Sequence, residues 1–463
     1  MKKNEAAGKK LVLTDKKIVP MDKKQVTTDK KIVPIDKKQV TTDKKIVPID
    51  KKQVITDKKI VPMDKKQVTT DKKIVPMDKK QVTTDNKIVP MDKKQVTTDN
   101  TIVPMDKKIM STGNFQVKIF QEINKSNIGK NLMVSPLSIY HILSLTANGA
   151  VNKTLEEMVQ ALSEKNLVEL NKNNKLISSS ISSLKTIELA NAVFTRFKPL
   201  ENFLKIIEEY KAKLDELKDA AQVNKWCDDA THHKIPKIVD KITGADKMVL
   251  INAIYFKGIW EQPFDKKGTR IDIFMNLNKH PKKISFMNNT KKFDYFENEH
   301  IQAISLNYVK DNLKALIILP KKTGINNYIK NFTSEKYHMI INELINKKVN
   351  LSLPKFEIDF SAELKPNFQS LGMKEAFTNS ADFSAMRKEK DIYISSIIHK
   401  TFIKVDEKGT EAAAATAVVM RCMALPPEPI PIMKVDHPFL FIIGNKDLPY
   451  GNDMLFISKV ESL

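Results

Sequence analysis

The amino-acid sequence predicts an α+β fold for the larger part of the chain, residues 111–463. Helical and strand-like segments are mixed along this part without regular strand–helix alternation, which argues against a doubly wound parallel sheet. Several of the strand-like segments are almost continuously apolar, as in strands that are buried on both faces. The first 110 residues have a different character. We therefore divide the chain into an N-terminal arm, residues 1–110, and a body, residues 111–463, that forms one domain.

The arm is built from a fourteen-residue repeat, DKKIVPMDKKQVTT, that starts at Asp15. Each repeat contains a Pro that would break a helix and a Thr pair of low helix propensity, so a coiled coil is excluded. Aromatic residues are absent, and a typical repeat has four Lys and two Asp. Such a sequence cannot bury enough apolar surface to offset its ordering entropy. We expect residues 1–110 to be disordered and to serve as an inert expansion, a spacer or a basic tether that contacts acidic surfaces.

The formal net charge of the chain is +23, and most of it belongs to the arm, which has 29 Lys against 15 acidic residues. The basicity therefore does not indicate nucleic-acid binding by the body. The arm also lacks the interleaved aromatic residues that are typical of single-strand binders.

Two cysteines, Cys227 and Cys422, are present, without a CxxC pair. This count predicts neither a disulfide framework nor a zinc site, and we expect no metal and no cofactor. We expect Cys227 to be buried and Cys422 to be an exposed thiol. No apolar run reaches about 18 residues, so no membrane insertion is expected, and the first residues lack the apolar segment of a secretory signal.

The elements of the body follow from local patterns. An amphipathic helix is expected around Phe115, Ile119, Phe120 and Ile123, which share one helical face. Residues 131–150 predict a short strand and then a helix that starts at Pro136. Further strands are expected at 247–260, 313–320 and 349–358. The C-terminal residues 438–460 predict two apolar strands joined by a turn.

The most informative stretch is residues 405–443, VDEKGTEAAAATAVVMRCMALPPEPIPIMKVDHPFLFII. A glycine, Gly409, is followed by a tract of very small residues from Glu411 to Ala417, a variable tip and a Pro-rich return. An Ala-rich tract alone would also fit a surface helix.

This stretch resembles the reactive-centre loop of an inhibitory serpin, of the clade-B-like type, with an added N-terminal repeat arm. Seven segments resemble serpin sequences in the same order: NLMVSPLSI, ELANAVF, NKWCDDATHHKI, LINAIYFKGIWEQPF, LPKFEID, ADFSAM and IIHKTFIKVDEKGTEA. The resemblance implies the serpin fold, with mixed and antiparallel sheets, surrounding helices and an exposed loop at about 407–434. It implies an inhibitor of serine-type endopeptidases and not an enzyme. No GxSxG, HExxH, P-loop or GxGxxG motif is present.

By this resemblance, a protease cleaves the loop, and the amino-terminal part of the loop then inserts into the central sheet. The residues expected in this hinge are Glu407, Gly409, Thr410, Glu411, Ala412, Ala413, Ala414 and Ala415. Because strand residues alternate between faces, Thr410, Ala412, Ala414, Thr416 and Val418 would face the core, where small uncharged side chains fit. Glu411 would lie on the opposite face. Before cleavage, we expect Thr410 to lie near the exposed end of the sheet and to tolerate substitution.

The family spacing, sixteen residues after Glu407, places the reactive bond between Met423 and Ala424. Met423 suits an elastase-, chymotrypsin- or subtilisin-like protease. The alternative bond, between Arg421 and Cys422, would suit a trypsin-like protease. The return segment is a few residues longer than in the family, which affects the tip more than the hinge.

The resemblance also assigns residues that control opening of the sheet. Ser135, Ser138, Asn252 and His399 correspond to the hydrogen-bonded shutter of serpins. Trp260 and Glu407 correspond to the breach, where insertion begins. Ser458 stands where many serpins have Gly, and residues 213–226 are shorter than the family pattern.

The alternative function is that of a non-inhibitory serpin, such as a carrier, chaperone or storage protein. Such relatives carry bulky, charged or proline residues in the hinge, and residues 410–417 contain no bulky residue or proline and only Glu411 as a charge. We expect a monomer. The family resemblance favours the extracellular space, whereas a true start at Met1 would favour the cytoplasm.

Overall fold

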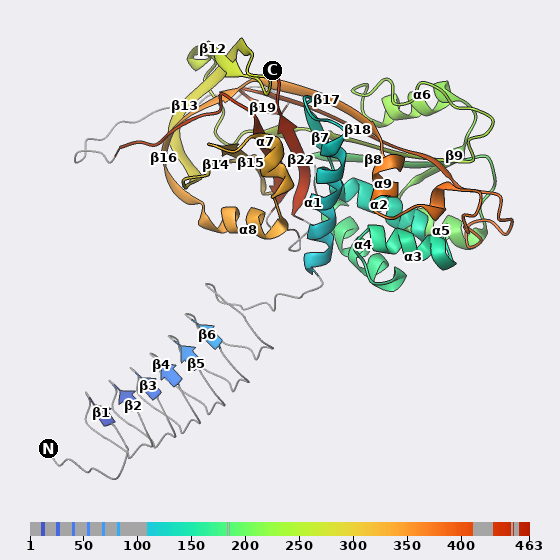
Figure 1. Cartoon of the computed structure of the whole chain (residues 1–463), viewed down its shortest axis with the longest axis horizontal. Helices are drawn as coiled ribbons and strands as arrows, with labels where there is room; N and C mark the ends of the chain where they lie inside the picture. The colour runs from blue at the N-terminus through green and yellow to red at the C-terminus, as the bar shows by residue number, and fades with distance from the viewer. Residues whose placement is uncertain are drawn as a thin grey trace. The chain divides into compact units, whose positions relative to one another are not determined.

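The computed structural model describes residues 109–410 and 429–463, except 183, 185, 446, 447 and 449–452, together with six short strands in the arm (Figure 1). The chain divides into two compact units, Met1–Lys107 and Lys108–Leu463, which we describe separately.

In the arm, the described residues are six three-residue strands that pair in parallel, in chain order. They are β1 (Leu11–Leu13), β2 (Gln25–Thr27), β3 (Gln39–Thr41), β4 (Gln53–Ile55), β5 (Gln67–Thr69) and β6 (Gln81–Thr83). From β2 onwards each Gln pairs with the Gln fourteen residues later, so the register of the ladder equals the sequence repeat. The remaining residues of the arm lie outside the described part, and its disorder stays a prediction.

The first sheet of the body has seven strands. In spatial order six of them are β11 (Gly258–Ile259), β19 (Gly409–Thr410), β18 (Ile394–Asp406), β10 (Met248–Phe256), β8 (Ile187–Thr195) and β9 (Lys213–Glu216). The seventh, β17 (Phe356–Glu363), pairs antiparallel with the other edge of β18. The central pair, β10 and β18, is parallel, and every residue of β10 is buried. This confirms the predicted buried strand over 248–256, whereas the predicted segment 247–260 is interrupted at Lys257, beyond which Gly258–Ile259 form β11.

The second sheet has nine strands. The order of eight of them is β20 (Ile432–Lys434), β16 (Ile345–Pro354), β13 (Pro281–Glu297), β14 (Ile301–Asn307), β15 (Leu313–Pro320), β21 (Phe439–Asn445), β22 (Met454–Val460) and β7 (Leu132–Val134). The ninth, β12 (Arg270–Met275), pairs antiparallel with the first residues of β13, on the edge opposite β16. The predicted C-terminal hairpin is β21 with β22, which pair antiparallel. The predicted strand at 349–358 is divided at Lys355 between β16 and β17, which belong to different sheets.

The helices in the described part are α1 (Ile109–Lys125), α2 (Pro136–Ala147), α3 (Asn152–Ala161), α4 (Leu167–Ser182), α5 (Glu201–Glu209), α6 (Ala220–Ala230), α7 (Ile325–Lys330), α8 (Ser334–Glu343) and α9 (Lys365–Ser370). The fold is therefore α+β, as predicted. α2 is completely buried. It packs against β8 and β10 of the first sheet and against β22 of the second sheet, so it forms part of the core beneath both sheets. None of the described helices is long and apolar enough to cross a membrane.

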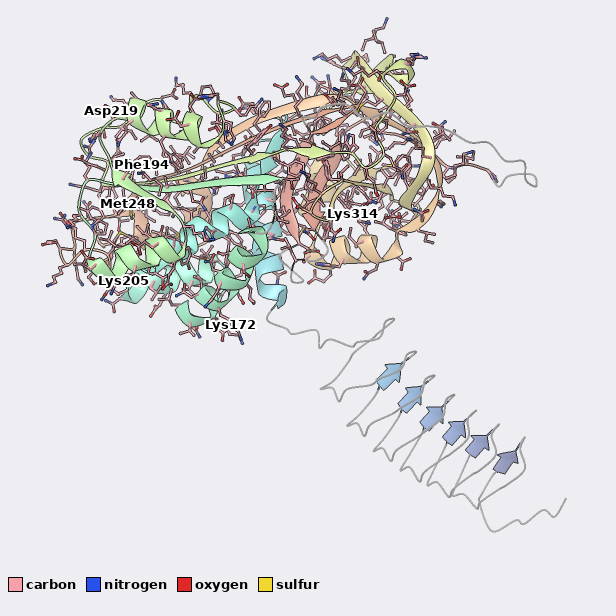
Figure 2. The ribbon with its side chains drawn as sticks, turned by 180° about the vertical axis from the view of Figure 1, so that it is seen from behind. Lys172, Phe194, Lys205, Asp219, Met248 and Lys314 are labelled. Atoms are coloured by element: carbon pink, nitrogen blue, oxygen red, sulfur yellow. The ribbon has the colours of Figure 1, made fainter. Side chains whose placement is uncertain are left out.

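The first sheet is covered on both faces at the end that carries β8. Figure 2 shows α5, with Lys205, and α6, whose preceding residue is Asp219, on opposite sides of the strands that carry Phe194 and Met248. Val223 and Cys227 of α6 pack in a second apolar cluster with Phe194. Cys227 is buried as predicted, and burial raises the pKa of its thiol to about 12.

Candidate functional site

Gly409 begins β19, the short strand that leads toward the predicted reactive loop. Its φ is +144°, a conformation that side chains with a Cβ rarely adopt. A Cβ at this position would lie 2.2 Å from the carbonyl oxygen of Gly258. Both constraints require glycine, because β19 passes directly against the backbone of β11.

β19 lies between β11 and β18, at the end of the sheet where β10 and β18 no longer pair with each other. Gly409 and Thr410 pair antiparallel with Ile259 and Gly258 on one side. On the other side they pair antiparallel with Asp406 and Val405 of β18. Beyond this point β10 and β18 pair directly with each other. β19 therefore occupies two residue positions at the open end of the sheet. The seam between β10 and β18, which we call the central seam, is closed from Met248 to Tyr255.

Thr410 is held inside the breach by an aromatic pair. Its side chain is 1% exposed, and its hydroxyl lies 3.1 Å from the hydroxyl of Tyr308. The Tyr308 ring stacks on Trp260, with centroids 4.4 Å apart. Trp260 donates from Nε1 to the carbonyl oxygen of Asp406 at 3.0 Å. The expectation that Thr410 lies near an exposed end of the sheet is therefore wrong: it is already in the core, because β19 is already paired on both edges.

Glu407 anchors the turn before β19. Its carboxylate accepts hydrogen bonds from Lys355 Nζ at 2.9 Å and from the hydroxyl of Thr269 at 2.8 Å. Burial by itself would raise the pKa of Glu407, but these bonds and a backbone hydrogen bond outweigh it and lower the pKa. The ion pair thus fixes the start of the loop to the connection between β16 and β17.

The four predicted shutter residues lie together under the central seam. Asn252 on β10 and His399 on β18 are directly paired residues of the parallel ladder, and His399 Nδ1 lies 2.5 Å from Asn252 Oδ1. Ser138 of α2 donates its hydroxyl to the same oxygen at 2.7 Å. Ser135 contributes its backbone N–H, which donates to His399 Nε2 at 3.2 Å. All four residues are at most 1% exposed.

These contacts define the protonation state of His399. Nε2 accepts a hydrogen bond from an N–H, so the ring is neutral and carries its proton on Nδ1, which donates to Asn252. Burial lowers the pKa of His399 to about 3. The shutter is therefore an uncharged group whose hydrogen bond joins the two strands across the seam.

The predicted reactive bond and most of the hinge lie outside the described residues. These residues are Glu411, Ala412, Ala413, Ala414, Ala415, Arg421, Cys422, Met423 and Ala424. The structure describes the two ends of the loop. Residues 407–410 form the turn before β19 and β19 itself, and residues 429–434 lead into and include β20.

Sequence reasoning missed four residues of this site: Thr269, Tyr308, Lys355 and Asn191. Asn191 accepts a hydrogen bond from Asn252 Nδ2, which extends the shutter to β8. In the sequence, Tyr308 continues the apolar alternation of Ile304 and Leu306, a signal that predicts burial but not the partner Thr410. The other partners come from distant parts of the chain, and no local pattern brings them together.

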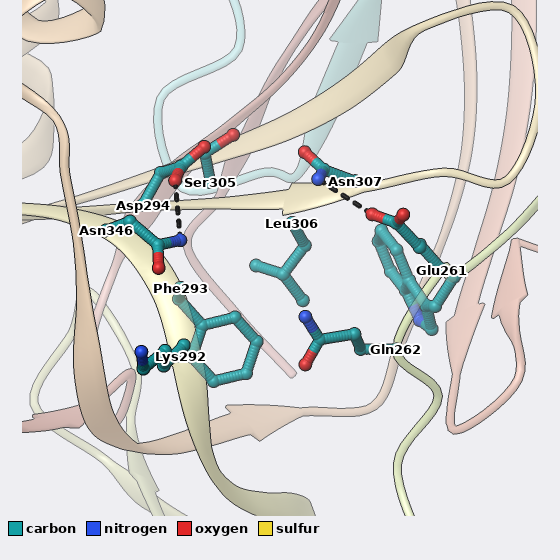
Figure 3. Close-up of a pocket in the computed structure, with 10 residues that line it drawn as sticks. Glu261, Gln262, Lys292, Phe293, Asp294, Ser305, Leu306, Asn307 and Asn346 are labelled. Atoms are coloured by element: carbon teal, nitrogen blue, oxygen red, sulfur yellow. Dashed lines mark hydrogen bonds between the residues drawn. The ribbon is translucent and has the colours of Figure 1, made fainter. Parts of the chain in front are cut away.

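A small cavity of about 40 Å³ adjoins Trp260 (Figure 3). Its rim includes Glu261, which accepts a hydrogen bond from Asn307, and Asp294, which accepts one from Asn346. A space of this size is large enough for a few water molecules.

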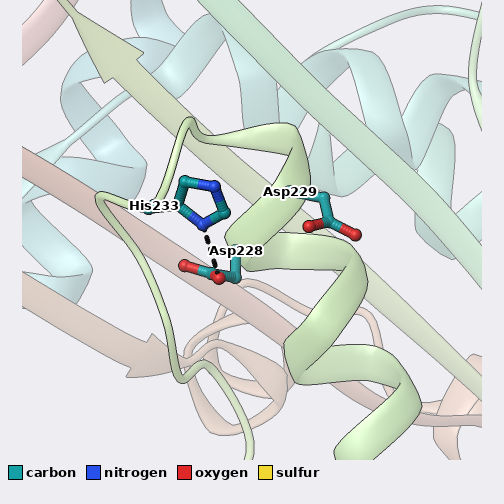
Figure 4. A group of neighbouring side chains, drawn as sticks. All are labelled: Asp228, Asp229 and His233. Atoms are coloured by element: carbon teal, nitrogen blue, oxygen red, sulfur yellow. Dashed lines mark hydrogen bonds and ion pairs between the residues drawn. The ribbon is translucent and has the colours of Figure 1, made fainter.

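Asp228, Asp229 and His233 form a cluster at the end of α6 (Figure 4). His233 Nδ1 lies 2.7 Å from Asp228, which raises the pKa of the imidazole, and Asp229 pairs with Lys225 at 3.0 Å. His233 and Asp229 are exposed, and contacts within the chain account for the arrangement.

Comparison with known proteins agrees with this architecture. A family model described as serpin (serine protease inhibitor) matches residues 110–463. The chain is 34% identical to a leukocyte elastase inhibitor of Xenopus laevis over 71% of this chain and 93% of that protein. It is also 34% identical to human Serpin B8 over 75% of this chain and 97% of that protein.

Among solved structures, the native state of the thermophilic serpin tengpin matches with a TM-score of 0.70 and 32% identity, covering 80% of this chain and 96% of the other. The matched residues include both sheets, α2, the shutter and β19. The family description is that of an inhibitor, not of an enzyme. The chain belongs to the serpin family.

Proposed function

We propose that this serpin inhibits serine proteases as a suicide substrate, with loop cleavage followed by insertion of the loop into the first sheet between β10 and β18. The observation that carries this proposal is the pairing of β19. The last described residues before the loop already lie antiparallel between β11 and β18. The loop can therefore extend an existing strand instead of starting a new one.

The register of β19 supports a continuous insertion. Thr410 pairs with Val405 on one side and with Gly258 on the other. Each further loop residue would move one position back along both flanking strands. β10 and β18 keep one constant offset from Val249 and Ser396 onwards, so the new strand would stay in register with both strands from Thr410 to Val419.

The same register accounts for the residue types of the hinge. Ala412 would lie opposite Ile403 and Phe256, both fully buried. Thr416 would lie opposite His399 and Asn252, so its hydroxyl would arrive at the polar part of an otherwise apolar core. Small side chains enter such a closely packed core without steric conflict, and a charge would not.

The proposed chemistry is that of a serine protease interrupted after its first step. The protease serine attacks the carbonyl carbon of Met423, the bond to the nitrogen of Ala424 breaks, and the new amino terminus leaves with a proton. Met423 is then joined to the protease as an ester. If the loop inserts before water attacks this ester, the protease is carried along the sheet and stays bound.

The closed central seam supplies the barrier that keeps the loop out before cleavage. Insertion must separate β10 from β18 and break the hydrogen bond between His399 and Asn252. The two strands are otherwise joined along the seam from Met248 to Tyr255.

The test is incubation with elastase-, chymotrypsin-, subtilisin- and trypsin-like proteases, followed by a denaturing gel. We expect a stable band of higher mass with a protease of apolar specificity, in line with the name of the Xenopus relative. Mass spectrometry of the released peptide then identifies the bond, Met423–Ala424 or Arg421–Cys422. Cleavage without a stable band for every protease would contradict inhibition and favour a carrier, chaperone or storage role.

A further inference from the structure

The outer face of the first sheet carries a row of charges that lacks one member. Glu357 on β17 pairs in register with Lys404 on β18, and both side chains are exposed, with Nζ 3.6 Å from the carboxylate. At the same level on the far side of β19, Lys257 follows the end of β10 and is also exposed. Between the two lysines is the position at which β19 would continue beyond Thr410.

The register defines which residue would occupy that position. Thr410 pairs with Val405 and Gly258, so the next residue, Glu411, would be directly opposite Lys404 and Lys257. Thr410 faces the core, and its neighbour in a strand faces outward. Directly opposite residues of an antiparallel pair have Cβ atoms about 4.5–5.5 Å apart, within reach of an ion pair.

We propose that Lys257 and Lys404 form an electrostatic receiving site for Glu411, which stabilises the first inserted residue in the register that β19 already has. Insertion would complete a row of alternating charge across four strands: Glu357, Lys404, Glu411 and Lys257. This inference rests on the proposed insertion mechanism and adds a positioning role for the two lysines that the loop sequence alone does not reveal.

The physical basis is that Glu411 is the first residue to enter after Thr410. A one-residue slip would turn Glu411 and every later outward side chain toward the core. Attraction between the Glu411 carboxylate and the two lysines directly opposite it favours the correct register. Both lysines stay exposed to solvent, so this attraction requires no desolvation. Within the described residues, the ion pairs of the sheet include one for Lys404 but none for Lys257.

The experiment is a mutant cycle on the full chain. The variants are Glu411→Gln, the double variant Lys257→Gln with Lys404→Gln, and all three changes together. Lys348→Gln, an exposed lysine on β16 in the other sheet, is the matched control. The readout is the number of inhibitor molecules consumed for each protease molecule trapped, because slower insertion lets more acyl-enzyme hydrolyse.

We expect insertion to slow about twofold to fivefold in the Glu411 variant and in the double lysine variant, the range of one cross-strand ion pair, so that the excess of this number over one rises by the same factor. The triple variant should be no worse than either, since the interaction is already lost. Exchanging every charge of the row, with Glu357→Lys, Lys404→Glu, Glu411→Lys and Lys257→Glu together, should restore the wild-type value. At about 1 M salt, where the Debye length is about 3 Å, wild type should approach the variants. Additive effects, or lysine variants that match the Lys348 control, would overturn the proposal.

A second measurement separates this proposal from the proposed function. A metalloprotease cleaves without an acyl-enzyme, so the gain in melting temperature after it cuts the loop reports insertion alone. If wild type gains no stability on cleavage, the insertion mechanism itself is wrong, and the receiving site with it. If wild type gains stability and the lysine variants behave identically throughout, only the receiving site is wrong.

Discussion

Burial strongly disfavours protonation of His399. In the unfolded chain its pKa would be near 6.5, whereas burial lowers it to about 3 in the folded chain. The folded state keeps His399 neutral, whereas the unfolded chain binds a proton once the pH falls below about 6.5. The contribution of His399 to stability is therefore fully present above pH 6.5 and is lost as the pH falls from about 6.5 toward 3. We expect the free energy of unfolding to fall by about 2 kcal/mol from this residue between pH 7 and pH 5. Denaturant titrations at several pH values measure it, and a His399→Gln variant should show a smaller loss over the same interval.

Ser458 is a second residue with a distinct energetic signature. It is fully buried in β22, and its hydroxyl has no hydrogen-bond partner among the described residues. A buried unsatisfied hydroxyl is unfavourable by about 1–3 kcal/mol. We expect Ser458→Ala to raise the free energy of unfolding by about 1 kcal/mol, measured by denaturant titration. A lower stability would show that the hydroxyl makes a favourable contact.

Met423 is the residue that would define the target. We expect Met423→Arg to shift inhibition from proteases with apolar pockets to trypsin-like proteases, because an arginine side chain requires an acidic partner in the specificity pocket. Rates of complex formation with one protease of each kind measure the shift. If this variant changes nothing while Arg421→Ala abolishes inhibition, the reactive bond is two residues earlier.

At the scale of elements, β19 determines how the loop meets the sheet. Because Thr410 is already buried, Thr410→Arg would place a charged side chain beside Tyr308 and Trp260. We expect β19 to leave the breach, with little effect on the remaining fold, since only two residues are paired there. Insertion would then require burial of an unpaired guanidinium, so the variant should be cleaved at the same bond and released as a substrate.

The matched control is Thr410→Val, which removes the hydroxyl contact with Tyr308 but adds no charge. It should keep the covalent complex, with a loss of stability of about 1 kcal/mol. Normal trapping by the arginine variant would contradict insertion and leave a simple lock-and-key inhibitor. Denaturing gels and circular dichroism of both variants provide the comparison.

The sequence predicted elements whose signal is local and missed contacts that arise only from packing. The apolar run of β10 and the C-terminal hairpin of β21 with β22 were predictable, because each pattern lies within one segment. The shutter residues were identified by family resemblance alone. The burial of Thr410 was predicted wrongly, because it depends on β11, β18 and Tyr308, which come from three distant segments.

At the scale of the whole molecule, the body forms a compact unit of its own, Lys108–Leu463, and the family match begins at residue 110. We expect deletion of residues 1–107 to leave a cooperative thermal transition and the same inhibition. The reason is that both large apolar clusters consist of residues from 115 onwards. Scanning calorimetry of the truncated chain measures the transition, and its loss would show that the arm contributes to folding.

The central seam between β10 and β18 has a consequence for how such an inhibitor acts in a cell or fluid. There is one seam in each molecule, and on the proposed mechanism it closes around the loop permanently. On this mechanism each molecule would react only once, whether it traps the protease or is cleaved without trapping it, so the extent of inhibition would depend on the amount of inhibitor present. A short rise in protease activity would be inhibited until all the inhibitor had reacted. Further inhibition would then depend on the rate at which new inhibitor is synthesised and not on a dissociation constant.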